Sequence, residues 1–302
     1  MLFRSLLRFL VSVQLGVRSL SVNPAEAKCL CHIFIDAYAS ALSIGKARWV
    51  ERETAVGLVR ELLDGLKERT RPMFLDLRTE LKGKRRRIRT DGKKALPVDE
   101  KRRASVEALL KEFAKTQENP NFYSVRDVAC RIAGTGSLGV ERYIVLIEGK
   151  GSPDSNYLLD LKQAVPSSLV PYLKNKQPKW MSDAERVVTL QNRMQAISMA
   201  FLHAVSLDGE SYILRSLQPS EDRVALPRWN GKLRRLEEVM TVMGQVTAWA
   251  HLRSSGRSGS AIADELIDFG RRTDWQQPLA EAATQRTASV IADWQRFTKA
   301  NG

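Results

Sequence analysis

Alternating apolar and polar positions mark the middle of this 302-residue chain as β-structure. Three runs rich in Val, Ile and Tyr cover residues 123–133, 140–149 and 156–163, and a fourth strand-like run covers 211–217. In the third run Leu159 and Leu161 share one face and Asp160 and Lys162 share the other, because successive strand side chains point to opposite sides. The pattern predicts a compact antiparallel sheet.

Apolar positions spaced three and four residues apart predict helices on both sides of these strands. The expected helices cover residues 2–20, 24–43, 51–69, 99–116, 182–205, 232–254, 258–270 and 276–299. Asn23 with Glu26, and Ser182 with Glu185, have the spacing of capping boxes that begin helices. The order of elements predicts an α+β fold, with a small antiparallel sheet, a long packed helix and a mainly helical remainder.

Composition places the chain among ordinary soluble proteins, since 43% of its residues are hydrophobic and 27% are charged. Three regions are expected: a helical region with a basic hairpin over 1–120, a sheet lobe over 121–222, and a helical region over 223–302. Three cysteines supply no disulfide framework, which favours the cytoplasm. The apolar N-terminus is too short and too charged to span a membrane, so no membrane partner is expected.

A glycine-rich stretch, Gly134-Thr-Gly-Ser-Leu-Gly139, separates the first two predicted strands. A dinucleotide-binding fold would need a helix to begin at these glycines, and no helical pattern follows them. The tip of an antiparallel hairpin is where a kinase places the glycine-rich loop that covers phosphates. We therefore take Gly134, Gly136, Ser137 and Gly139 as candidate nucleotide-binding residues. The alternative is that the glycines only supply positive φ angles for the turn.

Lys162, on the next strand, stands where a kinase-like fold holds its phosphate-binding lysine. It also fits a solvated lysine on the outer face of a strand. A kinase orients this lysine with a carboxylate from the following helix, and Glu185 is the one carboxylate in residues 185–205. Glu185 either pairs with Lys162 or closes its own capping box. Gln191 and Gln195 are alternative polar partners for the lysine.

Two other motifs resemble metal-binding sequences, but the secondary structure predicted around them is not that of a metal site. Cys29-Leu-Cys31-His32 lies on a predicted helix, where residues two apart face away from each other. Asp268-Phe269-Gly270 spells the metal-binding tripeptide of protein kinases, but it ends a helix-like run in which Gly270 fits a C-cap. We therefore assign neither a catalytic residue nor a metal ligand.

The formal charge of +14 is concentrated in one segment, since residues 82–103 contain eleven Lys or Arg against three acids. Its centre, residues 84–89, precedes Asp91-Gly92, a strong tight-turn signal that predicts a basic hairpin. Such a segment is either a polyanion-binding patch or a solvated hairpin beside a charged helix. Aromatic residues are not interleaved with the charges, so stacking on nucleic-acid bases is not supported.

Several stretches resemble a bacterial family known as domain of unknown function 2252. The similar stretches are residues 128–143, 156–162, 185–188 with 191–195, 214–223 and 249–251. The resemblance implies a relative of protein kinases and aminoglycoside phosphotransferases with its parts in a rearranged order. The family carries His-x-Asp-Leu-His-x-x-Asn-Phe-Gly and Asp-Phe-Asp motifs before the glycine-rich loop. Neither motif occurs here, and residues 2–20 resemble the helix after the second, so we expect an N-terminally truncated member.

The sequence thus predicts an uncharacterised kinase-like protein with a remnant nucleotide-binding lobe that is inactive alone. ATP is its expected ligand, bound weakly, with residues 213–218 placed to meet an adenine, and Mg²⁺ is not expected in this chain alone. Phosphotransferase activity would need the missing motifs from upstream or from a separate chain. The alternative is a non-enzymatic binding protein that uses residues 82–103 on nucleic acid, the less favoured partner, or on an acidic protein.

Overall fold

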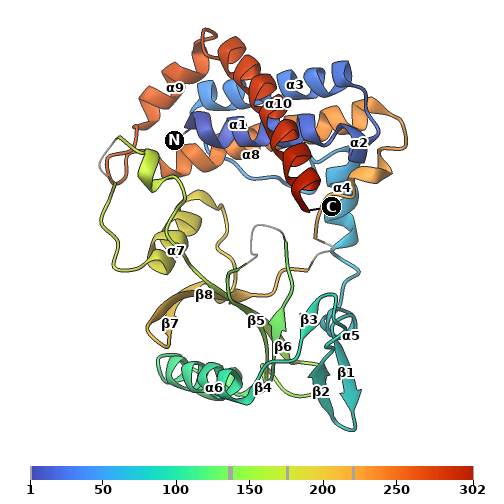
Figure 1. Cartoon of the computed structure of the whole chain (residues 1–302), viewed down its shortest axis with the longest axis vertical. Coiled ribbons are helices and arrows are strands. Elements are labelled where there is room, and N and C mark those ends of the chain that lie inside the picture. The colour runs from blue at the N-terminus through green and yellow to red at the C-terminus, as the bar shows by residue number, and fades with distance from the viewer. Residues whose placement is uncertain (1, 135–138, 175–176, 220–221, 302) are drawn as a thin grey trace. The chain divides into compact units, whose positions relative to one another are not determined.

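The computed structural model describes residues 2–134, 139–174, 177–219 and 222–301 (Figure 1). The chain divides into two compact units: unit 1 combines residues 1–67 with 223–302, and unit 2 is continuous over 68–222. The described part of unit 1 is helical and unit 2 contains the sheets, so the fold is α+β as predicted. This division joins the first and last helical regions and places the basic segment with the sheet.

Unit 1 is built from helices that pack around one hydrophobic core. They are α1 (Leu2–Leu15), α2 (Val17–Leu20), α3 (Pro24–Ile44), α4 (Gly57–Gly65), α8 (Leu233–Ser254), α9 (Ala263–Arg271) and α10 (Gln276–Asn301), with a 3-10 turn at Leu226–Trp229. The helix predicted over 2–20 is divided at Gly16, and the one predicted over 51–69 covers only α4. Gly57 has a φ of 52°, which the interior of a right-handed helix does not contain.

The central helix α3 begins at the predicted capping box. The Asn23 side chain accepts the Glu26 N–H at 2.9 Å, and the Glu26 carboxylate accepts the Asn23 N–H at 2.7 Å. The helix ends at Gly45, whose φ of 71° is left-handed. By length and composition α3 would also pass as a membrane span, but half of that stretch is buried inside unit 1. We therefore treat α3 as a core helix.

Two glycines let α8 and α9 approach α3 closely. A Cβ on Gly244 of α8 would lie 2.5 Å from the Phe34 carbonyl oxygen, and a Cβ on Gly270 of α9 would lie 2.7 Å from the Ser43 nitrogen. Both distances are shorter than real Cβ contacts, so only glycine permits this helix packing. The prediction that Gly270 is a C-cap was wrong, because α9 continues to Arg271.

Unit 2 contains two sheets and the helices around them. The strands are β1 (Thr79–Lys82), β2 (Arg85–Ile88), β3 (Ala95–Leu96), β4 (Val125–Arg131), β5 (Arg142–Ile147), β6 (Tyr157–Gln163), β7 (His203–Leu207) and β8 (Glu210–Ser216). The helices are α5 (Arg71–Asp76), α6 (Glu100–Lys115) and α7 (Asp183–Met194), with 3-10 turns at Pro120–Tyr123 and Val170–Tyr172.

The larger sheet has the order β3-β4-β5-β6-β8-β7, and every neighbouring pair is antiparallel. The predicted three-stranded unit β4-β5-β6 and its pairing with the strand near 211–217 are therefore confirmed. Since β5 follows the glycines directly and no helix begins at Gly139, the arrangement is not that of a dinucleotide-binding fold.

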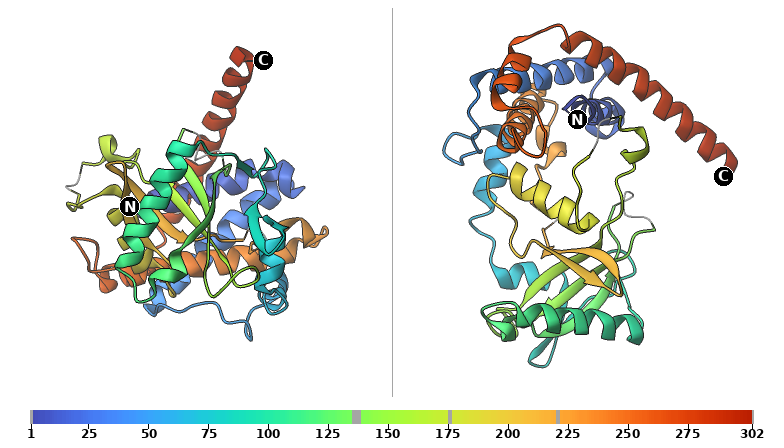
Figure 2. Two further views of the ribbon diagram at one scale, coloured as in Figure 1. Left: turned by 90° about the horizontal axis from the view of Figure 1, so that it is seen from below. Right: turned by 90° about the vertical axis from the view of Figure 1, so that its left-hand side faces the viewer.

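The two faces of this sheet are covered differently. On one face, Val145, Leu159 and Leu214 pack against Leu110 and neighbouring residues of α6, which crosses that face (Figure 1 and Figure 2). On the other face, a small core cluster around Ile88 of β2 covers only part of the strands. α7 packs on another part of the second face, where Ala184 meets Ile213 of β8, and charged side chains lie between these two covered parts.

The long helix predicted over 182–205 was too long. α7 ends at Met194, and residues 203–207 form the edge strand β7 instead. β7 turns into β8 through Asp208 and Gly209, whose φ values are 51° and 82°. Positive φ at both central residues is the geometry of a tight hairpin turn. Asp208-Gly209 between alternating apolar residues is a sequence signal for this hairpin, which we did not predict.

The basic hairpin also turns at a different place from the one predicted. β1 and β2 pair from Thr79↔Ile88 to Lys82↔Arg85, so the tight turn contains Gly83. The predicted turn at Asp91-Gly92 lies in the connection from β2 to β3. There the Asp91 carboxylate accepts the backbone N–H groups of residues 93, 94 and 95.

Candidate functional site

The glycine-rich hairpin connects β4 to β5, as expected. Gly134 and Gly139 have φ values of 64° and 75°, and a Cβ on either would meet no atom within 4 Å. Glycine is therefore needed at these two positions for backbone conformation and not for space. Gly136 and Ser137, the other two predicted residues of the hairpin, lie outside the described residues.

Three arginines surround one carboxylate at the base of this hairpin. Arg131 ends β4, Arg142 begins β5, and Arg215 lies on β8. One oxygen of Asp160 accepts from Arg131 Nη1 and Arg142 Nε, both at 2.7 Å. The other accepts from Arg142 Nη2 at 2.7 Å and from Arg215 Nε at 3.0 Å. We call these four residues the arginine cluster.

Strand register brings the cluster together. On β6, Asp160 lies opposite Ile144 of β5 and opposite Arg215 of β8. Lys162, two residues further along, lies opposite Arg142. Because residues two apart on a strand share a face, all of these side chains lie on one face of the sheet. We call the arginine cluster together with Lys162 the cationic face.

The carboxyl of Asp160 is held ionised by its neighbours. Asp160 is only 1% exposed, and burial by itself raises the pKa of a carboxyl. Hydrogen bonds from Arg142 and the charges of Arg131, Arg142 and Arg215 outweigh that effect and lower the pKa of Asp160 to about 2. One negative charge therefore stabilises three guanidinium groups that would otherwise repel each other.

Lys162 lies on the predicted face but lacks the predicted carboxylate. Burial lowers the pKa of its ammonium, repulsion from Arg142 and Arg215 lowers it further, and Asp160 partly offsets both effects. Among the described residues, no carboxylate comes within ion-pair distance of Lys162. Across the two neighbouring strands, Lys162 lies opposite the cation Arg142 and the apolar Ile213.

Glu185 serves the start of α7. The Ser182 hydroxyl accepts the Glu185 N–H at 3.0 Å, and the Glu185 carboxylate accepts the Met181 N–H at 2.6 Å. This agrees with the capping interpretation, although Glu185 reaches one residue beyond the N-cap. Its binding role toward a nucleotide stays a prediction.

α7 packs on the sheet face that carries Lys162, since Ala184 shares a small core with Ile213 of β8. The side-chain oxygens of Gln191 and Gln195 are buried and accept no hydrogen bond within the described part of the chain. Neither glutamine is bonded to Lys162. Each therefore has an acceptor that is not satisfied in this state.

The two motifs whose sequence resembles a metal site, Cys29-Leu-Cys31-His32 and Asp268-Phe269-Gly270, are parts of helices α3 and α9. Asp268-Phe269-Gly270 is helical within α9, as interpreted from the sequence, and the Phe269 ring stacks on Trp275 with centroids 4.6 Å apart. Cys29 is exposed whereas Cys31 is buried, so the two thiols face different surroundings. Among the described residues, no three His, Cys, Asp or Glu side chains gather as a metal site would require.

The basic segment 82–103 contains one buried arginine. Arg86 on β2 has a side chain 2% exposed, and it contacts Asp76 at 2.5 Å and Asp154 at 2.8 Å. Its Nε also donates to the Pro153 carbonyl at 2.7 Å. Arg86 is therefore part of the fold and is not available to a polyanion.

Other arginines of the same segment are paired as well. Arg103 contacts Asp127 at 2.9 Å, and Arg102 contacts Glu141 at 2.6 Å. These ion pairs neutralise part of the local charge of +8 that the sequence gives to residues 82–103. The segment is therefore a charged face that carboxylates pair in part.

The arginine cluster was not predicted as a site. Sequence reasoning placed Asp160 and Lys162 on one face, but it did not connect them to Arg131, Arg142 or Arg215. A signal was present, since Arg131 and Arg142 bound the glycine-rich stretch at the two strand ends. The alignment of these strands with β8 could not be obtained from alternation alone.

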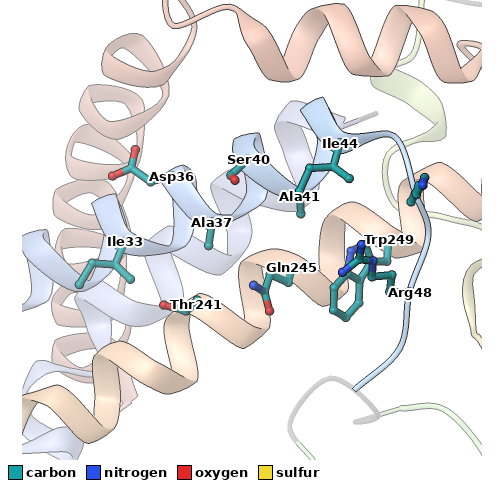
Figure 3. Close-up of a pocket in the computed structure, with 11 residues that line it drawn as sticks. Ile33, Asp36, Ala37, Ser40, Ala41, Ile44, Arg48, Thr241, Gln245 and Trp249 are labelled. Atoms are coloured by element: carbon teal, nitrogen blue, oxygen red, sulfur yellow. The ribbon is translucent and has the colours of Figure 1, made fainter. Parts of the chain in front are cut away.

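Unit 1 has a separate groove of about 420 Å³ between α3 and α8 (Figure 3). Thr241 and Gln245 of α8 line it, Trp249 and Arg48 lie together at one end, and Asp36 lies toward the other. The groove offers opposite charges at its two ends with neutral polar groups between them. None of the residues predicted as a site lines it.

One comparison with known proteins gives a match. Over residues 4–300 the chain matches the family described as an uncharacterized protein conserved in bacteria (DUF2252). No curated protein and no solved structure matches it. Since the match covers nearly all of the sequence, the chain belongs to this bacterial DUF2252 family.

Proposed function

We propose that unit 2 binds the phosphate groups of a nucleotide, with ATP as the first candidate, on the cationic face. The observation that carries this proposal is an imbalance of charge. Among the described residues, Arg131, Arg142, Arg215 and Lys162 share a small area of one sheet face with a single carboxylate, Asp160. An uncompensated group of half-buried cations is costly, and an anionic ligand removes that cost.

The hydrogen bonds leave donors for such a ligand. Arg131 and Arg215 each use one nitrogen on Asp160, and Arg142 uses two. A guanidinium has more N–H groups than these bonds consume, and its fork suits phosphate oxygens. Lys162 adds an ammonium, which binds phosphate as a point charge.

The arrangement has features of the kinase-type phosphate site. A kinase covers phosphates with a glycine-rich hairpin and contacts them with a lysine on the third strand. Here Gly134 and Gly139 lie on the hairpin β4-β5, and Lys162 lies on the following strand β6. This order supports nucleotide phosphate as the ligand in preference to an unrelated anion.

We propose that binding is weak and independent of Mg²⁺. In kinases, metal ions bridge the phosphates and neutralise their charge. On the cationic face, the guanidinium groups of Arg131, Arg142 and Arg215 would neutralise the phosphate charge in place of metal ions. The chain also has no counterpart of the family's catalytic-loop motif, so we expect no ATP hydrolysis by this chain alone.

Titration of the full chain with ATP, with and without Mg²⁺, tests the proposal. Lys162→Met should weaken ATP binding about tenfold, the effect of losing one charge-assisted hydrogen bond. Lys111→Met is the matched control, because Lys111 is exposed on α6, which covers the opposite face. We expect the control to leave affinity unchanged and Mg²⁺ to change it little.

Three outcomes would count against the proposal. Equal ATP affinities of wild type and Lys162→Met would reduce Lys162 to an ordinary strand lysine. A strong Mg²⁺ requirement would mean that carboxylates elsewhere hold a metal against the phosphates. Measurable ATP hydrolysis by the purified chain would refute the inactive interpretation.

A further inference from the structure

We propose that the cationic face recognises a polyphosphate chain and does not read a nucleobase. The inference rests on the proposed function and defines the ligand by its number of linked phosphates and not by its base. Nucleoside triphosphates with any base, and inorganic polyphosphate of three or more units, would bind alike. Nucleosides and monophosphates would bind poorly. This differs from the expectation that residues 213–218 meet an adenine.

The first argument is that the apolar part of this face is already covered. Leu146 and Leu158 lie beside the arginine cluster on the same strands, and both are at most 2% exposed. They pack with Leu75 of α5 and Ile88 of β2. Leu217, at the end of the segment expected to meet an adenine, is buried in the same small core. Within the described strands, the aliphatic side chains of this face are therefore buried and offer no exposed wall to a base.

The second argument concerns aromatic side chains. Stacking on an aromatic ring contributes about 1–3 kcal/mol per base. Tyr143, Tyr157 and Tyr212 lie on the sheet face that α6 covers, and Tyr143 and Tyr212 donate their hydroxyl protons to Glu141. On the opposite face, the described strand residues around the arginine cluster are aliphatic or charged. A base would find no stacking partner among them.

The third argument is the charge that remains. In the described part of the chain, four cations against one carboxylate leave this face with an excess of three positive charges. A chain of phosphates presents charge along its length, and it can contact several donors together. A monophosphate presents fewer oxygens and less charge, so it satisfies fewer of these donors.

A competition assay on the full chain without Mg²⁺ tests the inference at fixed ionic strength. The probes are ATP, GTP, tripolyphosphate, AMP and adenosine. We expect ATP, GTP and tripolyphosphate to bind within about threefold of each other. We expect AMP and adenosine to bind more than about tenfold more weakly, the loss that one or two charge-assisted hydrogen bonds produce.

Two variants identify the face. Arg215→Gln should weaken tripolyphosphate about tenfold. Arg85→Gln is the matched control, since Arg85 is an exposed strand arginine of β2 outside the cluster, and it should leave the affinity unchanged. Thermal unfolding of both variants verifies that they fold. If Arg215→Gln does not fold, Lys162→Gln provides a second test on the same face.

The outcomes separate this inference from the proposed function. Binding of adenosine or AMP as tight as that of ATP, or ATP much tighter than GTP and tripolyphosphate, would overturn base-independent recognition and leave nucleotide binding standing. A loss in Arg85→Gln equal to that in Arg215→Gln would assign binding to the basic segment and overturn it as well. Failure of every probe to bind would overturn the proposed function itself.

Discussion

At the scale of single residues, Asp160 is the carboxylate that holds the arginine cluster together. A buried carboxylate that accepts from three arginines compensates guanidinium charges whose side chains are only 11–24% exposed. Removing one partner of a buried ion pair is costly because the other charges stay buried and uncompensated. We therefore expect Asp160 to contribute to the stability of the cationic face.

We predict that Asp160→Asn lowers the free energy of unfolding by about 3 kcal/mol near neutral pH. The folded-state pKa of Asp160 lies below its ordinary value, so its contribution is complete above about pH 4 and is lost as the pH falls toward 2. Urea unfolding of wild type and variant should therefore converge as the pH falls.

The control for this prediction is Asp268→Asn. Asp268 is exposed on α9 and lies 3.7 Å from Arg271, so its loss should change stability by less than about 0.5 kcal/mol. A pH-independent gap between wild type and Asp160→Asn would show that the asparagine acts through its shape or hydrogen bonding and not through lost charge.

At the scale of elements, the sequence predicted correctly those helices and strands whose signals lie within a few residues. Alternation located β4, β5 and β6, and caps located the starts of α3 and α7, because these signals lie within a few residues. β7 was missed because Met194, Ile197 and Phe201 follow a helical spacing. Phe201 instead has a φ of 60°, which a helix excludes.

The site shows the same limit. A single strand indicates which residues share a face, as Asp160 and Lys162 did, but not which residues of other strands lie beside them. Arg215 joins the cluster through pairing of β6 with β8, across the intervening residues 164–209. Such long-range register depends on tertiary packing, so the arginine cluster could not be assembled from the local pattern.

The packing of α3 gives a prediction for unit 1. Gly244→Ala should destabilise the chain by about 1–3 kcal/mol, because the added methyl overlaps backbone atoms of α3 that cannot move freely. Gly65→Ala is the control, since Gly65 ends α4 with no atom within 4 Å of an added Cβ. It should leave stability unchanged or raise it slightly. Thermal unfolding compares the two, and equal melting temperatures would contradict the close approach.

At the scale of the whole molecule, the charge of +14 invites comparison with nucleic-acid-binding proteins. The structure pairs several arginines of the basic segment with carboxylates and buries Arg86. Net charge therefore overstates the positive potential that this segment presents to a partner. Replacing Arg86 would test folding and not binding, so an experiment on the patch must use exposed cations instead.

We predict that heparin and duplex DNA do not bind the chain tightly at physiological salt. At low salt, retention should fall steeply as salt is added, because neutralised phosphates release condensed counterions. Lys84, Arg85 and Arg89 are three exposed cations of β2 and its flanks. Arg87 is exposed as well, but it contacts Asp127 at 3.5 Å. Replacing Lys84, Arg85 and Arg89 with Ala should remove most of the low-salt retention without lowering the melting temperature.

The control replaces Arg18, Lys28 and Lys299, three exposed cations of unit 1, with Ala, which removes the same amount of charge. If both triple variants lose retention equally, the interaction depends on net charge and not on the basic segment. Tight DNA binding at physiological salt that only the Lys84, Arg85 and Arg89 replacement abolishes would favour the non-enzymatic alternative. The same triple variant should bind tripolyphosphate like wild type, because the basic segment and the cationic face act separately.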